Sequence, residues 1–505
     1  MLGQKVAAVL EADSESARRA QWGEILNVLH EQATEIPFSG KSIPAVFNAR
    51  LGGYVKGLQQ FDYPMHTIRV ISGAKTITVA PGGQTGLFKG VGRLDPHSYR
   101  PNEFFANNWV YEGLVEYGPD GTILPALAES WSVADNGAGQ KYTFALRQGV
   151  KFHDGGEWNC AVAKLNFDHV LAEELTTGDW HGWYGLPKQI DGVSCADTHT
   201  LVLTTKGKYY PLLQELTYIR PMRMLSGEKF ACGPTSDAYT CNSCPGGWGN
   251  ITSTATPAGK TIECKGTTGI AGTGRWIYSS TESEVVNGED VVKSVTFKRN
   301  PTHWDASSAQ GVVEQIKLVA YADHAAVKAA LLDGSLDAVV GAGVLEPADI
   351  AAFRNGDHGA DAFVVSLTAP LMNRVVVFNT NKAPTNDLTN RKIMIHAVDK
   401  KAIIDKEMAG LAKPVANLFP LDAPYCNVDL TPVWSYDLEK SKLLNCPVPV
   451  PPAEKTGLPI GAGVALAAAV VVLGALFLYM RGREKSGNPL FTPLNGPAGK
   501  NVQMR

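Results

Sequence analysis

The sequence predicts an α/β protein followed by a single C-terminal transmembrane helix. Predicted strands alternate with a helix in one region, with strands at residues 295–298, 316–320 and 338–340 and a helix at residues 324–332. Separately, residues 458–480 (LPIGAGVALAAAVVVLGALFLYM) carry no charge and are long enough to cross a bilayer of about 30 Å. A chain of 505 residues is too long for one ordinary domain, so we expect two or three compact units.

The charge pattern bears on partners and on topology. Charged residues make up 19% of the chain and the formal net charge is −3, so nothing indicates nucleic acid binding. Arg481, Arg483 and Lys485 directly follow the apolar segment, which predicts a cytoplasmic tail at residues 481–505 and an extracytoplasmic N-terminal part. Residues 1–11 lack the apolar core of a signal peptide. We therefore interpret the chain as a fragment or an incomplete gene model, rather than one that its own span exports.

Residues 111–171 are the most informative stretch. Two runs of alternating apolar residues, 131–133 and 142–146, flank Asp135-Asn136-Gly137, whose residue types tolerate positive φ and predict a hairpin. Gly-rich breaks follow, and the apolar residues from Val162 to Leu171 then share one face of a predicted helix. Elsewhere we predict strands at residues 75–80 and 200–204 and a helix at residues 17–29.

Several short motifs in this stretch occur in a fixed order. They are residues 111–115 (YEGLV), 127–131 (LAESW), 142–147 (YTFALR), 149–155 (GVKFHDG) and 166–167 (NF). Together they resemble the signature of the family 5 extracellular solute-binding proteins, the receptors of peptide and nickel ABC importers. The sequence at residues 209–221 and 375–386 is closest to the nickel-binding branch, and this resemblance implies helices at residues 209–216 and 391–405. The resemblance implies a two-lobed, periplasmic-binding-protein-like (type II) fold with its ligand site between the lobes.

The resemblance also defines the predicted domains. Residues 71–445 resemble one solute-binding domain, interrupted at residues 225–270 by an inserted loop without periodicity, and the family's second half of the second lobe is missing. Residues 446–457 form a Pro-rich linker to the transmembrane helix at 458–480. Residues 1–70 resemble the C-terminal end of the same fold, as a remnant of an upstream tandem copy or as a circular permutation. We expect this segment to dock onto the 71–445 domain in the place of the family's C-terminal segment, because the apolar face of its own helix and strand would otherwise lie open to water.

Four of the eight cysteines lie in the inserted loop: Cys232, Cys241, Cys244 and Cys264. Outside a membrane, an even number of cysteines favours disulfides, and we expect two within this loop without choosing among the three pairings. Asn250 begins an N-glycosylation sequon in the same loop. A zinc site at Cys241 and Cys244 is less well supported, because four-thiolate sites usually show two close pairs.

The resemblance supplies the candidate ligand-binding residues. Arg220 matches an Arg of the nickel-binding branch that faces the cleft and holds a carboxylate of the metal chelator; a surface salt bridge is the alternative. Tyr99 and Trp183 match cleft-lining aromatic positions, and Trp180 replaces a second Arg. The family's metal-ligating His would lie in the missing part. His97, His153 and His181 show no metal-ligand spacing, so we predict no metal site and no cofactor.

We therefore predict a non-enzymatic, membrane-anchored protein that captures a small peptide or a metal chelate, in partnership with an ABC-type permease. No catalytic motif is visible in the sequence. The alternative is a membrane receptor or adhesion protein that keeps the solute-binding fold without transport, because fold resemblance does not decide between these two functions.

Overall fold

The computed structural model describes most of the chain between residues 2 and 445. The described ranges are 2–57, 61–83, 86–92, 94–97, 103–118, 120–171, 185–230, 250–256, 259–265, 269–305, 313–369, 372–419, 428 and 430–445, with only the backbone of 250–256 and 259–265. Residues 1–445 form one compact unit. The predicted linker, membrane span and tail lie outside the described residues. Among the helices that are described, none has the length and apolar character that a bilayer crossing requires.

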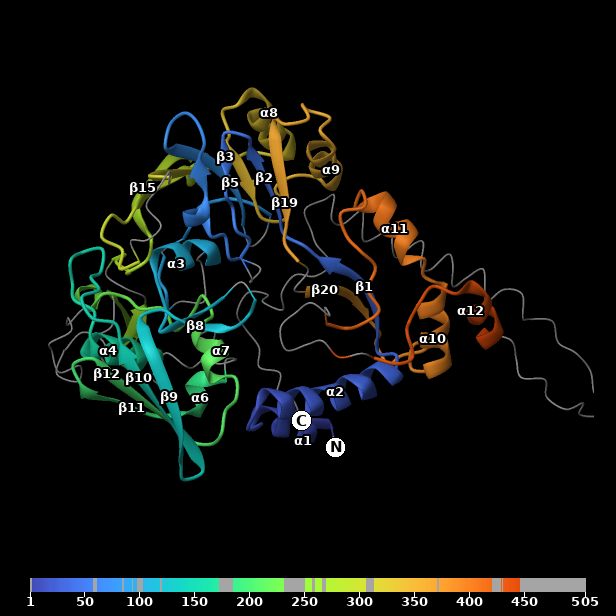
Figure 1. Cartoon of the computed structure of the whole chain (residues 1–505), viewed down its shortest axis with the longest axis horizontal. Coiled ribbons are helices and arrows are strands. Elements are labelled where there is room, and N and C mark those ends of the chain that lie inside the picture. Colours follow the sequence, from blue (N-terminus) through green and yellow to red (C-terminus); the bar gives the residue numbers. More distant parts are fainter. Residues whose placement is uncertain are drawn as a thin grey trace, which may run out of the picture. The chain divides into compact units, whose positions relative to one another are not determined.

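The largest sheet lies at the top of Figure 1 and follows the order β15-β16-β17-β5-β18-β2-β19, with the short β6 (Gly86–Leu87) paired to β5. Its strands are β2 (Pro44–Asn48), β5 (Thr76–Gly83), β15 (Trp276–Val286), β16 (Glu289–Arg299), β17 (Gln315–Val319), β18 (Ala338–Val340) and β19 (Phe363–Leu367). β5 pairs in parallel with both β17 and β18. The helices α8 (His324–Asp333) and α9 (Pro347–Asn355) bury apolar residues with β2 and β18. The predicted alternation of strands and helix over residues 295–340 is thus confirmed.

A second sheet, at the lower left of Figure 1, has the order β11-β12-β10-β9. Its strands are β9 (Ala128–Asn136), β10 (Gly139–Leu146), β11 (Ile190–Asp197) and β12 (Thr200–Thr205). The predicted hairpin is confirmed, since β9 pairs with β10 and Gly137 has φ +62°. The predicted helix is α4 (Cys160–Leu171), whose buried face packs on the sheet with Trp158 and Phe144.

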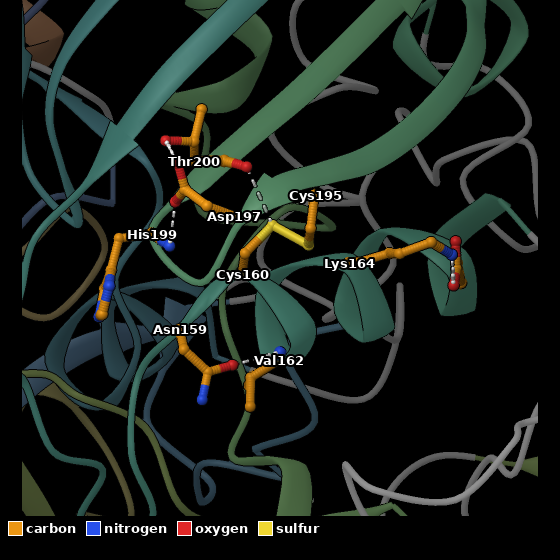
Figure 2. Close-up of a disulfide and its surroundings, with 9 residues drawn as sticks. Asn159, Cys160, Val162, Lys164, Cys195, Asp197, His199 and Thr200 are labelled. Atoms are coloured by element: carbon orange, nitrogen blue, oxygen red, sulfur yellow. Dashed lines mark hydrogen bonds and ion pairs between the residues drawn. A yellow bond between two sulfur atoms is a disulfide. The ribbon is translucent and has the colours of Figure 1, made fainter.

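A disulfide ties α4 to this sheet. Figure 2 shows it between Cys160, the first residue of α4, and Cys195 on β11. Two local caps hold the same region: the Asn159 side chain accepts from the Val162 amide at 3.1 Å, and Asp197 accepts from the His199 amide at 2.8 Å. Neither cysteine belongs to the Cys-rich loop, so the sequence prediction placed its disulfides elsewhere.

A third group of elements surrounds the pair β1 (Glu35–Lys41) and β20 (Met372–Val377). Three helices accompany it: α10 (Leu388–Ala397), α11 (Lys400–Glu407) and α12 (Leu438–Asn445). The single helix predicted over residues 391–405 was wrong. The helix breaks at Val398, and the Asp399 side chain caps α11 by accepting from the Ala402 amide. A small core of Ala33, Ile36, Ile395 and Trp434 holds this group together.

The N-terminal segment supplies strands to two of these sheets, and the predicted docking is seen. β2 lies between β18 and β19, and β1 pairs with β20. Arg50 also donates to Asp337 at 2.6 Å and to the carbonyl of Ala74 at 2.9 Å, beside the start of β5. Whether the segment is a tandem remnant or a permutation stays a prediction.

The segment begins with α1 (Leu2–Leu10) and α2 (Glu15–Glu31), which contact each other. α2 confirms the predicted helix, but a different face of the helix is buried. Ile25 is buried as expected, whereas Val28 is 43% exposed and Leu26 is buried instead. The reason is that α2 packs against residues far along the chain: Trp22 lies against Phe419 and His30 against Trp434.

The inserted loop also differs from its prediction. Residues 225–270 were expected to lack regular structure, but β13 (Asn250–Thr256) and β14 (Gly259–Lys265) form an antiparallel hairpin. The remaining short elements are β3 (Leu51–Gly52), η1 (Met65–Thr67), β4 (Arg69–Val70), α3 (Phe104–Val110), β7 (Val115–Tyr117), β8 (Ile123–Pro125), α6 (Leu186–Gln189), α7 (Leu212–Leu216) and η2 (Gly227–Lys229). α7 is shorter than the helix predicted over residues 209–216.

Candidate functional site

The carboxyl ends of the parallel strands β5 and β18 lie at the same edge of the large sheet. There the backbone at the end of β5 approaches the backbone after β18 closely. A Cβ added at Gly82 would lie 2.7 Å from the carbonyl oxygen of Ala342. Gly341 has φ +106°, and its Cβ would meet the Tyr63 hydroxyl at 2.3 Å. Only glycine fits these two positions. In α/β folds, ligands bind just outside the carboxyl ends of such strands.

Two hollows adjoin this edge. Lys41, Phe61 and Tyr63 line one of about 170 Å³, together with a glycine from each of β5 and β6. Its neighbour of about 250 Å³ is lined by Arg374, His324 and Glu346. They share Ala342 and Gly343, directly after β18. We call the two hollows together the strand-end site. Since β1 and β20 supply one wall and the large sheet the other, the site lies between two groups of elements.

The strand-end site carries two cations. Burial and the positive charge of Arg374 lower the pKa of Lys41, and burial lowers the pKa of Arg374. Arg374 donates from Nη1 to the carbonyl of Gly40 at 3.2 Å, which places it against β1. Among the described residues, no carboxylate lies within 4.0 Å of either side chain. Two cations without a carboxylate partner at this distance, the partly buried Lys41 and the exposed Arg374, attract an anionic group.

Arg220 lies behind an aromatic wall of this site. It is 2% exposed, and its guanidinium carbon lies 3.8 Å from the centroid of the Phe104 ring. Phe104 meets Phe61 edge to face with centroids 4.9 Å apart, and Phe61 lines the smaller hollow. Arg220 itself lines neither hollow. It is thus within two rings of the strand-end site but does not face it.

The other predicted site residues are not tested by the structure. Tyr99, Trp180 and Trp183 lie outside the described residues, as do Cys232, Cys241 and Cys244. Cys264 and Asn250 fall on β14 and β13, where only the backbone is described. Their roles in ligand contact, in disulfides and in glycosylation stay predictions.

Two of the three singled-out histidines have ordinary structural contacts. His97 Nδ1 lies 2.6 Å from His169 Nδ1 in a fully buried pair, and His153 Nε2 bonds to the carbonyl of Gly274 at 2.8 Å. His181 lies outside the described residues. A search of the described part of the chain finds no group of three His, Cys, Asp or Glu side chains that could hold a metal ion.

Sequence reasoning missed Lys41 and Arg374. Each is the one cation of a short strand, in the contexts EIPFSGK and MNRVVV, and β1 also carries the carboxylate of Glu35. A cation among apolar strand residues is a usable signal, because charged residues are uncommon in such strands. The pairing of β1 with β20, which brings the two cations together, joins residues more than 300 positions apart and left no local trace.

Comparison with known proteins shows which proteins this chain resembles in sequence and fold. Residues 122–445 match the middle region of the bacterial extracellular solute-binding proteins, family 5. The nickel-binding periplasmic protein of Escherichia coli is 31% identical over 400 residues, which are 79% of this chain and 62% of that protein. Heme-binding protein A of Haemophilus influenzae is 26% identical over 350 residues, 66% of this chain and 55% of that protein. The chain thus spans less than two thirds of the length of these relatives.

A solved structure shows the same fold. NikA from Brucella suis, crystallised in complex with Fe(III)-EDTA, has a TM-score of 0.58 and 30% sequence identity, over 72% of this chain and 63% of that one. The resemblance noted in the sequence is therefore confirmed. The chain belongs to the bacterial extracellular solute-binding proteins, family 5, and has their two-lobed α/β fold.

Proposed function

We propose that this protein is a non-enzymatic solute receptor that captures a small anionic solute, a short peptide or a metal chelate, at the strand-end site. The observation that carries the proposal is the pair of cations, Lys41 and Arg374, beside the carboxyl ends of β5 and β18. A peptide presents a terminal carboxylate, and a chelate such as Fe(III)-EDTA presents several. Both are groups that ammonium and guanidinium ions bind well.

The relatives support this class of solute. One is named for nickel binding, and a solved structure with 30% identity holds a metal chelate of a polycarboxylate. The two lobes of such a receptor close over the solute, which excludes water and strengthens each charged hydrogen bond. Delivery to an ABC-type permease is the corresponding role in transport.

Calorimetry of the full chain tests the proposal with three probes: dialanine, the nickel–L-histidine complex and Fe(III)-EDTA. We expect at least one of them to bind. Lys41→Met keeps most of the aliphatic stem of the side chain and removes the charge, so it should weaken that binding at least tenfold. Lys382→Met removes an exposed lysine outside the site and should change nothing. Binding of none of the three probes, or equal binding by the Lys41 variant, contradicts the proposal.

The proposal includes membrane anchoring through residues 458–480, with the binding domain outside and residues 481–505 in the cytoplasm. The support is the uncharged 23-letter segment and the three cations that follow it. Protease added to intact cells should remove the binding domain and spare a C-terminal tag. Loss of the tag with survival of the binding domain would reverse the orientation.

A further inference from the structure

A further cavity of about 260 Å³ lies apart from the strand-end site and shares no lining residue with it. One wall comes from residues 55–57 and 62–67 of the N-terminal segment. The opposite wall comes from β7, the start of β15 and the chain after α7. Side chains of both charges line it together with aromatic rings, and we call it the mixed-charge cavity.

The aromatic rings of Trp109 and Tyr111 line part of the cavity. Trp109 donates its indole N–H to the carbonyl of Tyr63 at 2.7 Å, and Tyr111 donates its hydroxyl to the carbonyl of Leu94 at 2.6 Å. With their polar atoms already bonded, these two rings present apolar faces. Such faces suit an aliphatic group of about the size of an amino acid side chain.

Two buried donors on this wall have hydrogens to spare. Trp276 is 1% exposed, and among the described residues its indole N–H has no acceptor. Arg223 is 5% exposed and donates from Nη2 to the carbonyl of Thr217 at 2.7 Å, whereas its Nε–H has no acceptor in the described part of the chain. A buried donor without an acceptor costs free energy, which a carboxylate in the cavity would recover.

An acceptor for a cation lies on the same cavity. Glu116 projects from β7, and no cation approaches within 4.0 Å of it among the described residues. Its neighbour Glu112 is already saturated, because it accepts from Thr273 at 2.7 Å, from Trp304 at 3.0 Å and from His303 at 3.0 Å. Glu116 is therefore the carboxylate that remains available.

The remaining polar side chains do not disturb this arrangement. Burial lowers the pKa of His66 to about 3, so the imidazole stays neutral at physiological pH. Arg275 is held by Asp305 at 2.6 Å. Lys56 and Asp62 lie on the wall that residues 55–57 and 62–67 form, and their formal charges of +1 and −1 sum to zero.

From these contacts we infer that the mixed-charge cavity is a second binding site, for an α-amino acid zwitterion with an apolar side chain. The ligand carboxylate accepts from Arg223 and Trp276, and its ammonium donates to Glu116. The aliphatic side chain lies against the rings of Trp109 and Tyr111. Because residues 55–57 and 62–67 form one wall, the site exists only while the N-terminal segment is docked.

Titration calorimetry of the full chain with L-leucine tests this assignment. Two analogues isolate the charged groups: 4-methylpentanoate lacks the ammonium, and 3-methylbutylamine lacks the carboxylate. We expect L-leucine to bind and each analogue to bind at least tenfold more weakly, because loss of the carboxylate leaves the buried donors of Arg223 and Trp276 unpaired and loss of the ammonium leaves Glu116 without a cation. No measurable binding of L-leucine at millimolar concentration, or equal binding of the analogues, overturns the inference.

Variants locate the site. Glu116→Gln should weaken L-leucine at least tenfold and leave the weak binding of 4-methylpentanoate unchanged, whereas the exposed hairpin substitution Glu289→Gln should affect neither. Trp276→Phe removes the indole N–H together with part of the bicyclic ring, and it should weaken both carboxylates; its urea unfolding curve checks that the variant is folded. Lys41→Met, which acts at the strand-end site, should not change L-leucine binding. A loss with Lys41→Met and none with Glu116→Gln would overturn the inference by moving the amino acid to the strand-end site.

Discussion

The Arg220 guanidinium lies over the Phe104 ring, with its central carbon 3.8 Å from the ring centroid. Arg220 is 2% exposed, and a desolvated cation–π contact of this kind contributes about 2 kcal/mol. Phe104 in turn contacts Phe61 of the strand-end site. The arginine that the sequence singled out thus contacts the strand-end site through two rings.

We predict that Arg220→Ala weakens binding of an anionic solute by about 1–2 kcal/mol, because the Phe104 ring beside the site loses the cation that it packs against. Arg220→Lys should recover part of this loss, because an ammonium keeps the charge but does not stack on the ring as a planar guanidinium does. Calorimetry with the probe that the wild-type chain binds gives the affinity, and Arg354→Ala on the exposed face of α9 is the control. Lower stability with unchanged affinity would assign Arg220 a structural role alone.

The ion pair between Arg50 and Asp337 fastens the N-terminal segment to the large sheet. Arg50 Nε lies 2.6 Å from Asp337 Oδ1, and Asp337 also accepts from the Thr78 amide at 2.8 Å. We predict that Asp337→Ala lowers the free energy of unfolding by about 3 kcal/mol, because a largely buried guanidinium and an amide lose their partner. Hydrogen exchange should accelerate in β2.

The control for this prediction is Asp361→Ala, which removes an exposed carboxylate from the same sheet edge. A double-mutant cycle with Arg50→Met isolates the pair itself. If Asp337→Ala leaves exchange in β2 unchanged, then the segment does not depend on this contact for its docking.

The disulfide between Cys160 and Cys195 closes a loop with a sequence separation of 35 residues. By the chain-entropy relation, a loop of this length stabilises the folded state by about 4 kcal/mol. The double variant Cys160→Ala/Cys195→Ala should lose about that much in urea unfolding. Alkylation and mass mapping of the oxidised protein should find neither thiol free, and labelling of both would refute the disulfide.

Lys400 predicts a pH dependence of stability. Its Nζ donates to the carbonyls of Pro37 at 2.9 Å, Val415 at 2.8 Å and Trp434 at 3.0 Å, and burial lowers its pKa to about 8. An unfolded lysine has a pKa near 10.4, so between about pH 8 and pH 10.4 the unfolded chain binds more protons than the folded one. Stability from this group therefore rises with pH across that window, by up to about 3 kcal/mol.

Urea unfolding of the wild type and of Lys400→Met at pH 8 and pH 10 checks this prediction. The difference in stability between the two proteins should change with pH, because the variant has no amine to titrate. Lys401→Met is the matched control. Lys401 is the next residue in the chain, and its side chain is 74% exposed and pairs with Asp405. A difference that stays constant from pH 8 to pH 10 contradicts the assignment.

The sequence by itself determined the family and the local elements. The motifs at residues 111–171 identified it, and hydrophobic periodicity located β9, β10, α4 and the alternation from β16 to β18. Such elements follow from contacts within a few residues, which a sequence displays directly. The break between α10 and α11 was missed because its cause is one capping side chain, Asp399, inside an otherwise helical pattern.

Tertiary structure alone decided which residues form the candidate sites. Lys41 and Arg374 come together through the pairing of β1 with β20, and Cys160 meets Cys195 across a helix and a sheet. The buried face of α2 was set by Trp434 and Phe419, some 400 residues further on. The ligand contact that the resemblance assigned to Arg220 stays a prediction, and only packing placed Phe104 over its guanidinium. The physical reason is common to these cases: burial and charge proximity arise from contacts between distant parts of the chain, and no local pattern encodes them.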